Sequence, residues 1–106
     1  RVNRFFQTRE HQGELQILLE KIPEDASRLA GQFQLPEIPS NSSLRGRKPL
    51  LTKTRGIGNE RITEPIFSAP KSFILSPQLH WIPLEKLPSL TIPGPHRRWI
   101  EELLDR

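Results

Sequence analysis

The chain has 106 residues, with 16 Lys and Arg against 12 Asp and Glu, and it contains no cysteine. Hydrophobic residues make up 34% of it, below the roughly 45–50% of an ordinary globular domain, while its 11 prolines are about twice the usual share. The missing cysteines exclude a disulfide scaffold, a thiolate zinc site and a thiol nucleophile, and no apolar run approaches the roughly 20 residues of a membrane-spanning helix.

The N-terminal segment carries apolar residues at the spacing of a helical face. These residues are Leu15, Leu18, Leu19 and Ile22, followed by Ala26, Leu29, Ala30 and Phe33. Pro23 separates the two runs, because proline interrupts a helix. Residues 1–34 are therefore expected to form a helical hairpin, with its first helix from Thr8 to Ile22.

A flexible connector and basic arm is expected over residues 35–61. Its second part, 44–61, holds six basic residues and a single acid; the basic residues are Arg45, Arg47, Lys48, Lys53, Arg55 and Arg61. A flexible cationic segment follows a polyanion and releases its counterions, so we expect these six side chains to bind RNA phosphates. The alternatives are a solvated charge run, a nuclear-import cluster at 45–48, and contact with an acidic protein surface.

Signals of catalysis or metal binding are weak in this sequence. The histidines His11, His80 and His96 are far apart, and none has a partner at zinc-ligand spacing. The Gly56 and Gly58 pair resembles the start of a phosphate-binding loop but lacks its lysine ending and the preceding strand, which favours a flexible loop. We therefore expect no metal site, no cofactor and no enzymatic activity.

A proline-rich apolar strap is expected over residues 62–94, because prolines at short intervals leave no room for a long helix. Residues 95–106 predict an amphipathic helix, with His96, Trp99, Ile100 and Leu103 on one face. Large apolar side chains in both segments are interpreted as protein-docking anchors. This set is Phe67, Phe73, Trp81, Trp99, Ile100 and Leu103.

Together these segments predict a mostly irregular, extended chain with short α-helices and no independent globular core. The composition resembles that of extended accessory ribosomal proteins. We therefore expect a structural subunit of a large ribonucleoprotein, the mitochondrial ribosome, that contacts rRNA and several protein subunits but no membrane and no small-molecule substrate. The alternative is a scaffold or adaptor of a nuclear (chromatin) or cytoskeletal (microtubule) complex, with a nuclear or cytoplasmic location.

Overall fold

The computed structural model describes residues 2–39, 44–69 and 76–106, and strands dominate these residues. The chain first forms β1 (Arg4–Phe6), β2 (Thr8–His11), β3 (Glu14–Lys21) and β4 (Phe33–Gln34). It continues with β5 (Leu51–Ile57), β6 (Glu60–Ser68) and β7 (Leu79–Pro83), and ends with a 3₁₀ helix, η1 (Leu84–Ser89), and α1 (Gly94–Leu104). None of the helices in these ranges is long and apolar enough to span a membrane.

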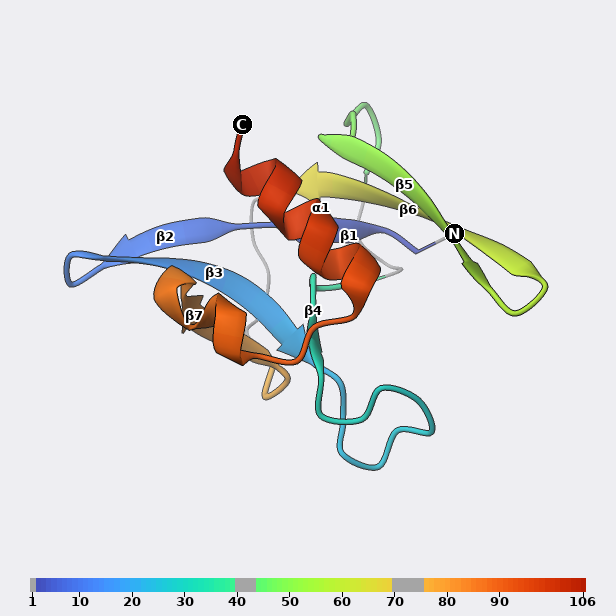
Figure 1. Ribbon diagram of the computed structural model, residues 1–106. Coiled ribbons are helices and arrows are strands. Elements are labelled where there is room, and N and C mark those ends of the chain that lie inside the picture. Colours follow the sequence, from blue (N-terminus) through green and yellow to red (C-terminus); the bar gives the residue numbers. More distant parts are fainter. Residues whose placement is uncertain (1, 40–43, 70–75) are drawn as a thin grey trace.

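The strands form two sheets, and the start of the chain contributes one strand to each of them, β1 to the first and β2 to the second (Figure 1). In the first sheet β6 is central, parallel to β1 and antiparallel to β5. In the second sheet β3 is central and pairs antiparallel with β2, β4 and β7. Because only Gln7 separates β1 from β2, the chain passes directly from one sheet to the other.

The central strands bury side chains on both of their faces. In β3, Ile17 and Leu19 belong to one apolar cluster and Leu18 to another, and all three are fully buried. In β6, Ile66 belongs to the same cluster as Ile17, and the next residue, Phe67, belongs to the same cluster as Leu18. Since successive side chains of a strand point to opposite faces, the two clusters lie on opposite sides of the sheets.

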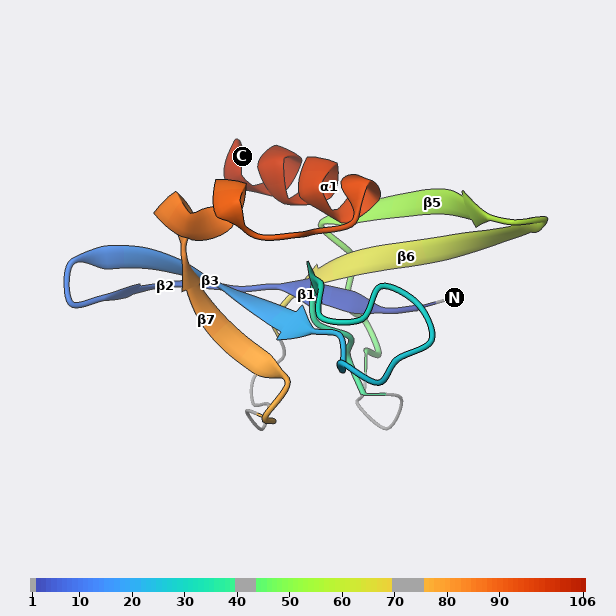
Figure 2. The ribbon, with the colours of Figure 1, turned by 60° about the horizontal axis from the view of Figure 1, so that its bottom comes forward.

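Helix α1 and η1 cover one of these faces (Figure 2). Trp99, Ile100 and Leu103 of α1 are buried there with Ile17, Leu19, Leu35, Ile66 and Ile92. This cluster and the side chains packed on it draw residues from the N-terminal strands, the expected basic arm, the expected strap and the C-terminal helix. The expectation of an extended chain without a globular core is therefore wrong.

The expected N-terminal helical hairpin is also wrong. Residues Thr8–Lys21 form the β2–β3 hairpin, in which Gln12 and Gly13 make the turn with φ of 53° and 77°. Positive φ at both central positions is the signature of a type I′ turn, whose twist matches that of paired strands. No helix follows Pro23, because Leu29 and Gly31 also adopt positive φ, which a helix does not allow.

The described parts of the expected basic arm and strap contain the strands β5, β6 and β7. Residues 51–68 form the β5–β6 hairpin, and Gly58 and Asn59 are its turn. Residues 79–83 form β7, which pairs with β3. Pro83 ends β7, Pro65 lies within β6, and Pro88 lies within η1, so prolines at short intervals do not keep this region from forming regular structure. The C-terminal helix is present as predicted, and its residues His96, Trp99, Ile100 and Leu103 are buried.

Candidate functional site

The side of the sheets opposite α1 carries the second apolar cluster. We call this side the helix-free face, because the helical residues of the described ranges pack only against the first cluster. Its buried side chains are Phe5, Leu18, Ile38 and Phe67, and Leu44, Ala69, Leu79 and Trp81 are partly buried against them. Of its aromatic side chains, Trp81 is partly accessible to solvent, whereas Phe5 and Phe67 are each only 2% exposed.

An arginine lies over the tryptophan of this face. The Arg9 guanidinium carbon is 4.3 Å from the centroid of the Trp81 ring. Its position is fixed from β3, since Arg9 Nε donates a hydrogen bond to Gln16 Oε1 at 2.7 Å. The strand pairing explains the contact. Arg9 of β2 is paired with Gln16 of β3. Trp81 of β7 is paired with Leu18, which lies two residues further along β3 and therefore on the same face as Gln16.

A second arginine lies near the phenylalanine of the same cluster. The Arg47 guanidinium carbon is 5.8 Å from the centroid of Phe67. Arg47 Nη2 donates to the carbonyl oxygen of Ser68 at 2.6 Å and to its hydroxyl at 2.7 Å, which fixes the guanidinium beside the end of β6. Two held guanidinium–aromatic pairs therefore border one apolar cluster.

The six expected polyanion-binding residues are divided between the two faces. Arg45 and Lys48 are exposed on the same loop as Arg47, and Arg61 is exposed at the start of β6. Lys53 and Arg55 point to the α1 side instead, where Lys53 Nζ is 3.0 Å from Glu102 Oε1 and Arg55 Nε is 3.1 Å from Glu64 Oε2. Successive side chains of a strand point to opposite faces, so Lys53 and Arg55, two residues apart in β5, share the face that α1 covers.

The ion pair of Arg55 belongs to a buried polar cluster beneath α1. Glu64 is fully buried, and Arg4 Nη2 lies 3.2 Å from its Oε1. His96, also fully buried, places Nε2 at 3.6 Å from the same oxygen. Its ring lies 4.8 Å from that of Trp99, and the Arg55 guanidinium is 6.0 Å from the Trp99 ring. The cluster thus ties β1, β5 and β6 to the helix.

Two pKa values are displaced in this cluster. Burial lowers the pKa of His96 below 6.5, and this exceeds the opposing attraction of Glu64. Burial raises the pKa of Glu64, but the nearby His96 ring and the charges of Arg4 and Arg55 outweigh it and hold the pKa below its usual value. At neutral pH the cluster therefore contains a carboxylate, two guanidinium groups and a neutral imidazole.

The other sequence-based candidates lie as follows. Trp99, Ile100 and Leu103, expected as docking anchors, are buried in the chain's own core, whereas Trp81 is partly accessible on the helix-free face. Phe73 lies outside the described residues. Sequence reasoning missed Arg9 and the buried cluster, because both depend on strand pairing between distant residues. Across the described ranges, no group of three or more His, Asp and Glu side chains is arranged to hold a metal ion.

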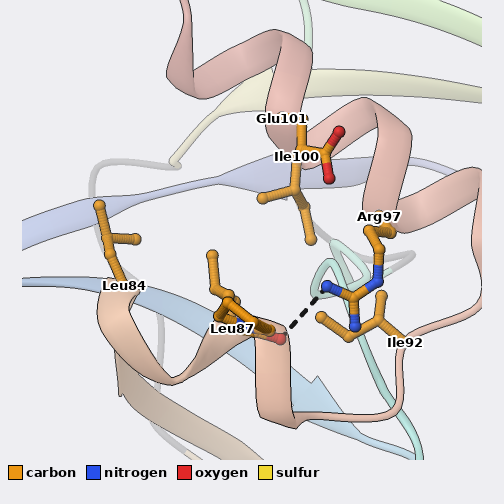
Figure 3. A pocket seen from close by; sticks show the side chains of 7 residues that line it. Leu84, Leu87, Ile92, Arg97, Ile100 and Glu101 are labelled. Carbon is orange, nitrogen blue, oxygen red and sulfur yellow. Dashed lines mark hydrogen bonds between the residues drawn. The ribbon is translucent and has the colours of Figure 1, made fainter.

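A pocket of about 320 Å³ lies between η1 and α1 (Figure 3). Its walls are mainly apolar, with one basic and one acidic side chain. The lining residues are Leu84, Leu87, Pro88, Ile92, Arg97, Ile100 and Glu101. It lies on the α1 side, away from the two guanidinium–aromatic pairs.

Searches with protein-family models and against curated protein sequences found no match. Solved structures do match. The NUDIX domain of Shewanella oneidensis NrtR, solved with ADP-ribose, superposes with a TM-score of 0.67 at 16% identity, over 99% of this chain and 86% of that chain. The chain has a Nudix-like fold.

Two further solved domains have the same fold. The C-terminal domain of mouse MUTYH, solved in complex with human PCNA, matches with a TM-score of 0.60 at 16% identity, over 98% of this chain and 86% of its own. RenU, a Nudix hydrolase from M. smegmatis, matches with a TM-score of 0.55 at 15% identity, over 98% and 83%. At these identities the likeness establishes the fold.

The fold corrects the functional expectations from the sequence. A structural subunit of a mitochondrial ribosome, or a scaffold in a nuclear or cytoskeletal complex, was inferred from an extended chain, and the Nudix-like fold overturns that premise. The expectation of an rRNA partner depends on the same premise and is also wrong. The expectations of no enzymatic activity and no small-molecule ligand are also wrong. Proteins with this fold include a hydrolase and a domain solved with ADP-ribose, so neither property can be excluded.

Proposed function

We propose that the chain is a nucleotide-binding domain, and that it binds a nucleotide unit on its helix-free face. The observation that carries this proposal is the pair of guanidinium–aromatic contacts, Arg9 on Trp81 and Arg47 near Phe67, at the border of one apolar cluster. Bases stack on aromatic rings and on guanidinium planes, and guanidinium groups pair with phosphate oxygens. Both kinds of group border this cluster. Arg9 lies in β2 and Trp81 in β7, the two strands on either side of β3. Arg47 lies in the loop before β5, and Phe67 in β6.

The charge of this face supports a phosphate-bearing ligand. Arg45 and Lys48 are exposed on the loop that carries Arg47, and the whole chain has a formal charge of +4. Such a surface attracts anions before contact is made. The match to a domain solved with ADP-ribose supports the same ligand chemistry, since that compound combines an adenine base with two phosphates.

Direct binding of two probes tests this proposal. The wild-type chain is titrated with ADP-ribose, a free nucleotide, and with a short single-stranded DNA oligonucleotide, in which the nucleotides belong to a strand. Trp81→Leu keeps an apolar side chain but removes the stacking ring, and Arg47→Gln removes the charge. Trp81→Leu should weaken binding about five- to 150-fold, because stacking contributes roughly 1–3 kcal/mol per base. Arg47→Gln should weaken it about tenfold or more, because a hydrogen bond to a charged group contributes roughly 1.5–3 kcal/mol.

The matched control is Arg98→Gln. Arg98 is exposed on α1, on the other side of the sheets, so its replacement should change affinity less than about twofold. Absence of binding for both probes, or equal weakening by all three variants, contradicts the proposal. Chromatography of the ADP-ribose mixtures shows in addition whether the bound compound is hydrolysed.

A further inference from the structure

The pocket between η1 and α1 contains a guanidinium group that forms no ion pair with the described residues. Arg97 is partly buried and lines the pocket together with aliphatic side chains (Figure 3). Among the described residues, no carboxylate lies within the 4.0 Å of an ion pair with it. Glu101 lines the same pocket but is exposed to solvent and makes no ion pair with Arg97.

The guanidinium group of Arg97 is held in place by neutral acceptors. Nη1 donates to the carbonyl oxygen of Leu87 at 3.2 Å, and Nη2 donates to that of Leu90 at 2.5 Å. These bonds fix the orientation of the group but leave its charge unneutralised. Arg97 also lies in the first turn of α1, which contains no acidic residue, so the positive end of the helix dipole adds to the local potential.

Apart from Arg97 and Glu101, the side chains that line the pocket are apolar. Leu84, Leu87 and Pro88 come from η1, Ile92 from the segment that follows it, and Ile100 from α1. The volume of about 320 Å³ is at the lower end of the roughly 300–1,000 Å³ found for small-molecule sites. The space therefore suits a compact ligand with a mainly hydrocarbon body.

We propose that this pocket binds a small amphiphilic carboxylate, with its hydrocarbon body among Leu84, Leu87 and Ile92 and its carboxylate on Arg97. The site is separate from the nucleotide-binding face, because η1 and α1 cover the opposite side of the sheets. A held guanidinium at an apolar site favours an anion over its neutral analogue, since a charge-assisted hydrogen bond is about twice as strong as a neutral one.

Methyl NMR of the full chain tests the proposal with octanoate as the probe and octanamide as its neutral counterpart. Octanoate should shift the methyl resonances of Leu84, Ile92 and Ile100, and it should bind at least about tenfold more tightly than octanamide. Equal affinity for both compounds overturns the role of Arg97. Absence of shifts in these methyl groups at saturation of the probe overturns the site.

Variants separate the charge from the shape of the pocket. Arg97→Lys keeps the charge and should retain more octanoate affinity than Arg97→Gln, whereas Arg98→Gln on the exposed side of the same helix should bind as wild type does. Because Arg97 also anchors η1, Leu84→Trp provides a second route: it fills the pocket without changing Arg97, and it should abolish the shifts. Unchanged binding in both Arg97→Gln and Leu84→Trp contradicts the proposal.

Discussion

The backbone N–H of Leu35 donates a hydrogen bond to Nδ1 of His96 at 3.1 Å. Because Nδ1 is the acceptor, the neutral ring carries its proton on Nε2, which faces Glu64 Oε1 at 3.6 Å. One imidazole thus joins α1, the segment after β4, and the carboxylate on β6. The charge state of His96 is therefore coupled to the packing of the helix on both sheets.

The first prediction follows from the lowered pKa of His96. Between that value and 6.5, the unfolded chain binds a proton that the folded chain does not. The free energy of unfolding should therefore fall as the pH decreases from 7 through this window, and His96 should contribute no pH dependence above it. Urea unfolding at a series of pH values measures the slope.

The control for this titration is His96→Asn. The Asn side-chain oxygen can accept the hydrogen bond from Leu35, but it does not titrate. The variant should show a shallower loss of stability between pH 7 and 5, with the remaining loss below pH 4.5 where Glu64, whose pKa is also lowered, becomes protonated in the unfolded chain. An identical slope in both proteins would show that other groups determine it.

The second prediction concerns Glu64. Glu64→Gln removes the charge that neutralises Arg4 and Arg55 while keeping nearly the same shape, so two guanidinium groups lose their buried partner. Removal of one partner from a buried ion pair costs about 3–5 kcal/mol. Urea unfolding should show a loss of this size. Glu60→Gln, at the exposed end of the same strand, should change stability by less than about 0.5 kcal/mol.

The sequence predicts the C-terminal helix correctly because its signals are local. A proline in the first turn and four apolar residues at helical spacing determine both its bounds and its buried face. The β2–β3 hairpin has a misleading pattern instead. The run Ile17, Leu18 and Leu19 is buried on both faces of a strand, and such a run also fits a helical period, so only the turn at Gly13 distinguishes the two.

The contact of Arg9 with Trp81 at the candidate site and the buried polar cluster beneath α1 could not be predicted from the sequence, because both join residues far apart in the chain. Arg4 and Glu64 are 60 residues apart, and Leu35 and His96 are 61 apart, so nothing local indicates either pair. The clustered cations at 45–55 are a local signal that the sequence does show. Their common interpretation as one flexible arm fails because β5 turns Lys53 and Arg55 toward α1, where each meets a carboxylate.

The third prediction tests the type I′ turn. A methyl group at Gly13 would meet no atom within 4 Å, so the only penalty of Gly13→Ala is its φ of 77°. This conformation costs an L-residue roughly 1–2 kcal/mol, and thermal unfolding should show that loss. Gly56→Ala is the matched change, since Gly56 lies in β5 without positive φ and with its nearest atom at 3.8 Å. It should be neutral or slightly stabilising.

The fourth prediction uses the two tryptophans, which are the only ones in the chain and lie on opposite sides of the sheets. Trp99 is 6% exposed in the core, so Trp99→Ala should cost about 3–5 kcal/mol of unfolding free energy. Trp81 is partly exposed beneath Arg9, so Trp81→Ala should cost clearly less. Urea unfolding of both variants measures this difference.

For ligand binding we expect the opposite ranking of the two tryptophans: replacement of Trp81 should reduce the affinity more than replacement of Trp99. Trp99→Phe keeps an aromatic ring in the core and leaves Trp81 as the only fluorophore, so its emission reports on the helix-free face alone. A nucleotide that stacks there should quench this emission, while Trp81→Ala should fold yet lose affinity. If ADP-ribose or single-stranded DNA binds to the Trp99→Phe variant without changing the emission of Trp81, the ligand lies elsewhere, and the helix-free face is not the nucleotide site.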